Sequence, residues 1–309
     1  MVIPAWRCEL KSYVTLLSLL LLIAGCATTS VNLPAVTDTA DGEFQPGKII
    51  WHDLLTNTPA ESRRFYEELF GWTFQSVGNL FGLGTNDTYA LIRHNGKLIG
   101  GMVDANQLNR NSEISQWVVA MSVADVDAAT EVFRASNGTV LTPPTDLSER
   151  GRLAVVTDPQ GALLALLQTK NGDPADREPE IGDFLWDELW TTDADAASAF
   201  YREVADYSGD VAPNQFNPQL NYHVLESGGR PRAGVMANPF GDVPPVWVSY
   251  IRVEDPSAIT ARVESLGGAI YVEDHARAAG GRAAFIADPS GAGIALQTWP
   301  LTTSEEIAQ

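Results

Sequence analysis

The sequence has few cysteines and few basic residues. Of its 309 residues only 2 are cysteine, and Lys and Arg number 20 against 39 Asp and Glu, for a net charge of -19. So acidic a chain repels nucleic acid and anionic lipid headgroups, which excludes nucleic acid as a partner. Both cysteines, Cys8 and Cys26, lie near the amino terminus. Cys8 lies in a segment that we expect to be removed, and we expect Cys26 to carry a lipid. The mature chain should therefore contain no disulfide, and its stability must come from core burial.

The sequence also has no apolar run long enough to span a bilayer. Its longest candidate, Tyr13–Ala24, falls short of the ~20 residues that a spanning helix needs. This run follows Arg7 and Lys11 and precedes Gly25 and Cys26. That order of charged, apolar and cleavage regions predicts a secretory signal.

The segment Leu22–Cys26 resembles a bacterial lipobox. We expect residues 1–25 to be a lipoprotein signal peptide and Cys26 to be lipidated, which anchors a protein to a membrane without a spanning helix. Ala27 after the cysteine is typical of sorting to the outer membrane, facing the periplasm, in a cell with two membranes. Residues 26–46 then form a flexible tether.

The rest of the chain repeats itself. Trp51–Thr56 matches Trp186–Thr191 at an offset of 135 residues, and Asp158–Gly161 matches Asp288–Gly291 at an offset of 130. Such self-similarity predicts two homologous domains. We place them at residues 47–169 and 183–300, with a linker at 170–182 and a tail at 301–309.

Each domain has the pattern of two βαβββ modules. In the first, a strand at Ile49–Thr56 leads to a helix that begins with a capping box at Thr58–Glu61 and ends at Gly71. Asn95-Gly96 predicts a hairpin turn. The other expected elements of the first domain are strands 72–77, 88–94, 97–103, 116–123, 152–157 and 162–168 and helix 125–136. Those of the second are strands 184–191, 246–253, 282–287 and 293–298, helices 194–204 and 256–266, and a hairpin at 228–229.

Three motifs together resemble the vicinal oxygen chelate (VOC) superfamily. They are the helix end Phe65–Trp72, the helix start Asp125–Asp127 and the Asp-Pro-x-Gly turns. The superfamily includes glyoxalase I, extradiol dioxygenases, fosfomycin resistance enzymes and bleomycin-binding proteins. The resemblance covers residues 49–299 and implies an α+β fold, in which paired βαβββ modules form the incurled mixed sheets of two VOC domains. It does not settle function, which depends on the site.

The resemblance also implies where a divalent metal would bind. Family enzymes typically use His or Gln in the first strand of a module and Glu in the last. The six corresponding positions here carry Trp51, Val118, Ala165, Trp186, Val248 and Ala295. Indole, isopropyl and methyl groups coordinate no metal. We therefore expect no metal and no cofactor.

His52 is the residue on which this expectation depends. Strand alternation puts Trp51, Asp53 and Leu55 on one face and His52 on the other, under the first helix. A slip of one residue would bring His52 into the cavity instead. The other histidines are expected to be packing or surface residues: His94, His223 and His275.

The side chains left for the cavities are mainly aromatic and acidic. The expected ligand-binding residues are Trp51, Asp53 and Leu55 in the first domain and Trp186, Glu188, Trp190, Tyr250 and Arg252 in the second. Aromatic walls with a few polar groups suit a flat or cationic small molecule. Alternatively, the tryptophans fill a closed core. Asp53 or Glu188, if desolvated, would have a raised pKa and could act as a general acid or base.

Tyr66 and Tyr201, at matching places on the first helix of each domain, are expected to be packing residues, and the Asp-Pro-x-Gly turns to be structural. The leading hypothesis is a membrane-tethered, metal-independent small-molecule-binding protein of the bleomycin-resistance type, a monomer with pseudo-dimeric tandem domains. One alternative is a VOC-type lyase, isomerase or dioxygenase that uses His52, or Asp53 and Glu188. Another is a structural lipoprotein of the cell envelope whose cavities are filled.

Overall fold

The structure, a computed structural model, describes residues 33–77, 88–108, 115–213, 221–241, 243–277 and 280–298. The expected signal peptide, the lipidation site Cys26 and the tail at 301–309 lie outside these residues. In the described part of the chain, no helix combines the length and the apolar character that crossing a membrane requires.

Both halves of the chain are built from short strands and helices. The first half contains β1 (Ile49–Thr56), α2 (Pro59–Phe70), β2 (Thr73–Ser76), β3 (Tyr89–His94), β4 (Lys97–Asp104), α3 (Ala105–Leu108), β5 (Gln116–Ser122), α4 (Val126–Ala135), β6 (Thr139–Asp146), β7 (Gly151–Thr157) and β8 (Leu163–Thr169). The second contains β9 (Phe184–Thr191), α5 (Ala194–Ala205), β10 (Val211–Pro213), β11 (Asn221–Ser227), β12 (Arg230–Ala237), β13 (Val246–Arg252), α6 (Pro256–Val263), the 3-10 turn η2 (Glu264–Leu266), β14 (Ala269–Ala276), β15 (Arg282–Ala287) and β16 (Gly293–Gln297).

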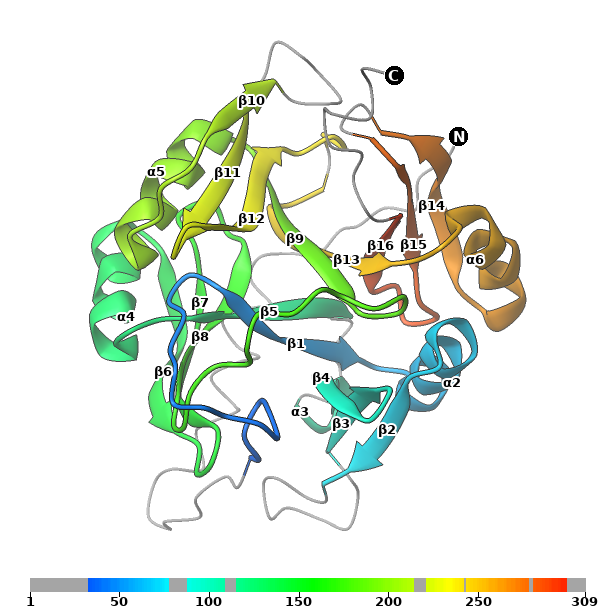
Figure 1. The fold of residues 1–309 in the computed structure, drawn as a ribbon, viewed down its shortest axis with the longest axis horizontal. Helices are drawn as coiled ribbons and strands as arrows, with labels where there is room; N and C mark the ends of the chain where they lie inside the picture. The colour runs from blue at the N-terminus through cyan, green and yellow to red at the C-terminus, as the bar shows by residue number, and fades with distance from the viewer. Residues whose placement is uncertain are drawn as a thin grey trace.

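Each half forms one 8-stranded sheet (Figure 1). The first sheet has the order β2-β3-β4-β1-β5-β8-β7-β6, and the second repeats it as β10-β11-β12-β9-β13-β16-β15-β14. At the centre of each sheet the first strands of its two modules run antiparallel, β1 beside β5 and β9 beside β13. The sequence prediction of an α+β fold with paired βαβββ modules is confirmed.

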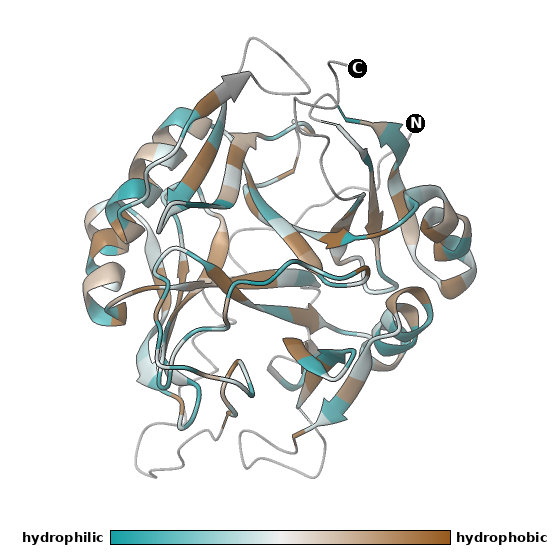
Figure 2. Ribbon diagram, in the orientation of Figure 1, coloured by the Kyte–Doolittle hydropathy of each residue, from teal (hydrophilic) through white to brown (hydrophobic). Residues whose placement is uncertain are grey.

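The helices pair between the two halves of the chain. Figure 1 shows α4 beside α5 at one side of the molecule and α2 beside α6 at the other. The apolar side of each helix is buried against the sheets (Figure 2). Two core clusters combine residues of both sheets, one around α4 and α5 and the other around α2 and α6. We call the face of each sheet that meets these shared cores its inner face, and the opposite face its outer face.

The ends of α2 show which local predictions hold. Gly71 ends the helix with φ 69°, a left-handed conformation that glycine adopts without strain. The predicted capping box is wrong, because the Thr58 side chain makes no capping hydrogen bond. The Thr58 N–H donates instead to Thr56 Oγ1, at 3.1 Å. The Asn95-Gly96 turn between β3 and β4 is confirmed, with φ of 48° and 79°.

The sequence prediction missed one edge strand in the first sheet and two in the second. β6 and β14 occupy matching edges of the two sheets, and β6 contains Pro143 and Pro144. Proline cannot donate a ladder hydrogen bond and therefore reads as a strand breaker, yet an edge strand tolerates it. The short edge strand β10 was missed as well.

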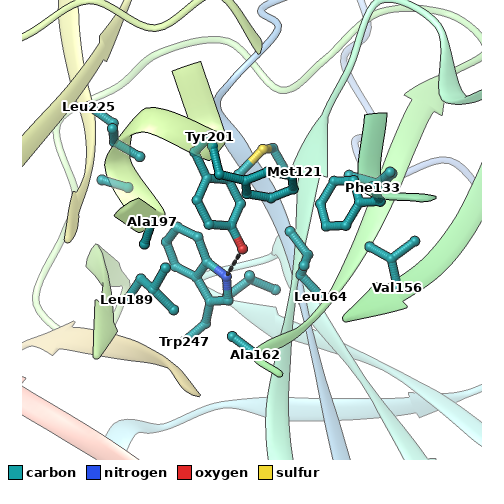
Figure 3. Packing of buried hydrophobic residues seen from close by; sticks show 14 of the residues in the cluster. Met121, Phe133, Val156, Ala162, Leu164, Leu189, Ala197, Tyr201, Leu225 and Trp247 are labelled. Atoms are coloured by element: carbon teal, nitrogen blue, oxygen red, sulfur yellow. Dashed lines mark hydrogen bonds between the residues drawn. The ribbon is translucent and has the colours of Figure 1, made fainter. Parts of the chain in front are cut away.

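Tyrosine and tryptophan side chains form matching hydrogen bonds on the inner faces of the two halves. The Trp247 indole donates to Tyr201 Oη at 3.2 Å, inside the cluster shown in Figure 3. Tyr201 on α5 in turn donates to Asp158 of the first half, at 3.1 Å. At the matching place, the Trp117 indole donates to Tyr66 on α2, at 2.9 Å. Both tyrosines are thus the packing residues that the sequence predicted.

The Asp-Pro-x-Gly turns are structural, as predicted. Asp158 Oδ1 accepts backbone N–H groups of Gln160 and Ala162, each at 2.9 Å. Asp288 Oδ1 accepts the equivalent N–H groups in the second half. Burial raises the pKa of both carboxyl groups. These aspartates therefore hold the turns that lead into β8 and β16.

Candidate functional site

The alternation of β1 places Trp51 and His52 on opposite faces of the first sheet. Trp51 packs in an outer-face cluster with Tyr89 and Ala165. His52 lies on the inner face, where its Nε2 is 3.0 Å from Asp187 Oδ1 and its ring stacks on Phe184 at 3.7 Å. Asp187 is the residue that matches His52 in the repeat, at a separation of 135. His52 is therefore a buried contact between the two halves, although the sequence placed it beneath the first helix.

A hydrogen-bonded group occupies the outer face of the first sheet. The Trp51 indole donates to Asp53 Oδ1 at 3.0 Å and to Tyr89 Oη at 3.1 Å. Tyr89 donates to the same oxygen of Asp53 at 2.7 Å. Arg150, from the loop before β7, donates to Tyr89 Oη at 3.0 Å, and its guanidinium lies 4.5 Å from the centre of the Trp51 ring. Trp51 and Asp53 thus belong to one polar cluster, which we call the first outer cluster.

The matching group of the second sheet is built around Glu188, whose side chain is fully buried. The Tyr250 and Tyr222 hydroxyls donate to it at 2.5 and 3.0 Å, and the Trp190 indole at 3.2 Å. The Arg277 guanidinium completes the group as an ion pair at 3.2 Å. We call this group, together with Trp186 bound to Tyr222 Oη, the second outer cluster.

Burial and the neighbouring charges determine the protonation states of the tyrosines and the arginine in the second outer cluster. Burial raises the pKa of the Tyr222 and Tyr250 hydroxyls well above the usual value, so both remain protonated donors toward Glu188. Burial by itself lowers the pKa of Arg277, but Glu188, Tyr250 and Tyr222 together outweigh burial and raise it. A charged guanidinium therefore faces a carboxylate whose oxygens are all occupied by donors.

The two clusters follow the sequence repeat. Asp53 lies opposite Gly101 on β4, and Glu188 lies opposite Gly234 on β12. In each half the hydroxyl of a tyrosine, Tyr89 or Tyr222, occupies the space that a Cβ on this glycine would need. A glycine inside a strand marks such close approaches. Gly101 and Gly234 are therefore the sequence signals that could have placed Tyr89 and Tyr222 in the two clusters.

Partly exposed aromatic rings surround the second outer cluster. Trp186, Tyr222, Phe240 and Phe285 are each only half-buried, and all pack against this cluster. The rings of Phe240 and Phe285 lie 6.4 Å apart and are nearly parallel, with an angle of 17° between their planes. Both rings also lie within 5.5 Å of the Trp190 ring. The outer face of the second sheet therefore presents flat apolar surfaces above a buried ion pair.

The structure places the residues predicted for ligand binding in the two outer clusters, with two exceptions, Arg252 and Leu55. Arg252 lies apart from Glu188, because its guanidinium contacts Pro179 and Glu178 of the linker. Arg277 supplies the cation instead. Leu55 is buried at 7 % exposure and takes no part in the polar contacts. The sequence prediction missed four residues of the two clusters: Tyr89, Arg150, Tyr222 and Arg277.

The remaining histidines belong to other parts of the molecule. His94 pairs with Asp183 at 2.7 Å, where the linker meets β3. His223 pairs with Asp195 on α5 at 2.6 Å, and His275 Nδ1 lies 3.0 Å from the Glu273 carbonyl oxygen. None of these three is part of either outer cluster.

Comparisons with known proteins agree with this geometry. Residues 48–166 match the family model of the Glyoxalase/Bleomycin resistance protein/Dioxygenase superfamily. A protein of Mycobacterium tuberculosis that carries the name of a glyoxylase, CFP32, is 31% identical over 253 residues, which cover 81% of this chain and 94% of that one. The chain belongs to this superfamily. The anthracycline biosynthesis protein DnrV of Streptomyces peucetius is 30% identical to it, over 82% of this chain and 94% of DnrV.

Solved structures show the same fold at low sequence identity. The Mn(II)-bound glyoxalase from Novosphingobium aromaticivorans aligns with a TM-score of 0.56 at 14% identity, over 82% of this chain and 83% of that one. BphC, a halotolerant catechol dioxygenase, aligns with a TM-score of 0.55 at 15% identity, over 84% and 89% of the two chains. At such identities the likeness concerns the VOC fold alone.

The expectation of no cofactor is contradicted by these neighbours. One structure of the same fold is a Mn(II)-bound glyoxalase, so a metal cofactor is compatible with this architecture. Six inert positions in the sequence were too narrow a basis for excluding one. They are only the places where family enzymes typically hold their metal, and a chain of this fold has other side chains in its loops.

The residues of the two outer clusters offer a divalent ion few ligands. Within the described ranges, no group of three or more His, Cys, Asp or Glu side chains comes together. Glu188 already faces the positive charge of Arg277, which would repel a divalent cation. Asp53 Oδ1 is taken by two donors. These side chains do not fit a divalent ion.

Proposed function

We propose that this VOC protein binds a flat aromatic small molecule on the outer face of its second sheet. The observation that carries the proposal is the set of half-buried rings around the Glu188–Arg277 pair. Parallel rings such as Phe240 and Phe285 offer faces on which a planar ligand can stack, and an aromatic pair contributes about 0.5–1.5 kcal/mol beyond the buried area.

The buried ion pair fixes the positions of the polar groups beneath such a ligand. Apolar pockets obtain their specificity from a small number of fixed polar groups. Here the polar groups are held in place by the contacts of Glu188 with Tyr222, Tyr250 and Arg277. The name of the relative DnrV, an anthracycline biosynthesis protein, supports the same class of ligand, since anthracyclines are flat polycyclic aromatic compounds.

Binding accounts for the geometry of Glu188 better than acid–base catalysis does. A general base needs a free lone pair within reach of the substrate proton. All four contacts of Glu188 come from donors, and its side chain is fully buried. Asp53 is the better candidate for proton transfer, because its second oxygen has no hydrogen-bond partner among the described residues. An enzymatic role of the lyase, isomerase or dioxygenase type would therefore involve Asp53.

A titration with doxorubicin, a soluble anthracycline, tests the proposed binding. We expect saturable quenching of tryptophan fluorescence, and a loss of affinity of about tenfold in Phe240→Leu, because a stacking face is removed. The matched control is Phe74→Leu, which changes a half-buried ring on β2 of the first sheet. Equal affinities of Phe240→Leu and the unaltered chain would contradict the proposal.

We further propose that Cys26 anchors the protein to the cell envelope, on the outer membrane where the cell has two. The support is the lipobox-like segment Leu22–Cys26. Expression in a bacterial host should place the chain in the membrane fraction, and Cys26→Ser should release it to the soluble fraction. Membrane recovery that is unchanged in Cys26→Ser would refute the anchor.

A further inference from the structure

Arg150 is a buried cation without an acidic partner in the described part of the chain. Its exposure is 2 %, and one terminal nitrogen of its guanidinium has no hydrogen-bond partner there. The other nitrogens donate to the Pro34 carbonyl and to Tyr89 Oη, both at 3.0 Å. A guanidinium stays charged in proteins, and a buried charge is costly unless a counter-charge accompanies it.

The second outer cluster shows what the first one lacks. There the arginine, Arg277, has Glu188 at 3.2 Å. The acid at the matching position of the first sheet is Asp53, whose side chain is one methylene shorter. Asp53 is held by Trp51 and Tyr89, and the Tyr89 hydroxyl bridges it to Arg150. The first cluster thus has the rings, the tyrosine and the arginine, but no carboxylate that reaches the arginine.

We propose that the first outer cluster is a binding site for a small organic carboxylate. The carboxylate would bind the unpaired nitrogen of Arg150, in the role that Glu188 plays toward Arg277. Arginine suits this task because its planar fork matches a carboxylate. The Trp51 and Tyr89 rings lie beneath the guanidinium, at 4.5 and 5.5 Å from it, and offer apolar contact to the body of the ligand.

In the structure, residues 33–36 of the chain cover this site. Val36, at 2 % exposure, and Leu33 pack into the outer-face cluster that contains Trp51 and Tyr89. The Pro34 carbonyl accepts the hydrogen bond from Arg150 Nε. A carboxylate brings the counter-charge that the Pro34 carbonyl lacks, so it binds the guanidinium more strongly than this carbonyl does. A carboxylate that spans the unpaired nitrogen and Nε takes the place of the Pro34 carbonyl and so displaces segment 33–36 from the first sheet.

Calorimetric titration of the full chain with benzoate tests the site. We expect saturable binding of benzoate and none of neutral benzamide. Arg150→Gln should weaken benzoate binding by at least about tenfold, because the charge-assisted bond is lost. The matched control is Arg152→Gln, which removes the same charge two residues away, from an arginine paired with Asp127 on the surface. Its affinity should equal that of the unaltered chain.

Two further variants decide the matter if Arg150→Gln does not fold. Asp53→Glu should supply an internal carboxylate, as Glu188 does in the second half, and so abolish benzoate binding while keeping the fold. Val36→Ser should loosen the cover and strengthen benzoate binding. Absence of benzoate binding in both the unaltered chain and Val36→Ser would overturn the proposal, and so would benzoate binding that Asp53→Glu leaves intact.

Hydrogen exchange tests the cover directly. Benzoate should speed the exchange of backbone amides in residues 33–37, because the segment leaves the sheet. Benzoate binding with unchanged exchange there would disprove the displacement. The proposal concerns the first sheet only, so its failure would be distinct from failure of doxorubicin binding at Phe240 in the second.

Discussion

At the scale of single residues, the difference between Asp53 and Glu188 separates the two halves of the molecule. One methylene lets Glu188 reach its arginine, so the second cluster is neutralised from within. Asp53 stops at Trp51 and Tyr89, which leaves Arg150 with a free donor. The two matching clusters therefore differ in their chemistry. The second presents an aromatic surface above a buried ion pair, and the first contains a cation that lacks its counter-charge.

Replacement of Arg277 by leucine should strongly destabilise the protein. Glu188 would remain buried without its counter-charge, and loss of one partner of a buried ion pair costs about 3–5 kcal/mol. Urea unfolding measures this cost. Arg252→Leu is the control, because Arg252 lies apart from the cluster and pairs with the exposed Glu178, and we expect a loss below about 1 kcal/mol. Similar losses in the two variants would contradict the role given to Arg277.

At the scale of helices and strands, each half is held by contacts with the other. α5 reaches Asp158 in the turn before β8 through Tyr201, while α2 packs against α6. The two tyrosines of the repeat, Tyr66 and Tyr201, each accept a hydrogen bond from a buried indole. The Tyr201–Asp158 bond and the packing of α2 on α6 join the two halves, whereas the two indole bonds join the modules within each half.

Tyrosine-to-phenylalanine changes should measure these contacts at the two matching positions. Either change leaves a buried indole N–H without its acceptor, which costs about 1–3 kcal/mol. Tyr201→Phe should cost more than Tyr66→Phe, because Tyr201 also donates to Asp158. Chemical denaturation gives both values. A larger loss in Tyr66→Phe would show that the Asp158 contact contributes little.

Much of this element structure could be predicted from the sequence, because it depends on local chemistry. Alternation along β1 put Trp51 and Asp53 on one face, and Asn95-Gly96 marked a hairpin. The edge strand β6 was missed because Pro143 disguises it. The arginines of the two clusters were missed for another reason. Arg150 and Arg277 stand in loops outside the described strands, where no periodicity fixes the direction of a side chain.

At the scale of the whole molecule, the two homologous halves of the chain pack together as two subunits of a dimer would. His52 and Asp187 are matching residues of the two copies, and they meet between the inner faces of the two sheets. Surface that would pair two single-domain subunits is therefore buried inside one chain. How the modules pair could not be predicted, because the sequence pattern specifies each module but not the partner of its inner face.

We expect the protein to be a monomer as a consequence. Sedimentation velocity should give one species near the chain mass of 33.4 kDa over a wide range of concentration. Cys26→Ser is the form to use, since it lacks the expected lipid. A stable species of twice that mass would show that further surface is available for association and would contradict this account.

The central claim is that a flat aromatic ligand binds above Glu188 and Arg277 on the second sheet. A crystal structure of the chain soaked with doxorubicin tests it most directly. We predict electron density for the fused rings against Phe240, Phe285 and Trp186. Density confined to the first sheet or to the molecular surface, with the second outer face unoccupied at saturating doxorubicin, would contradict the claim.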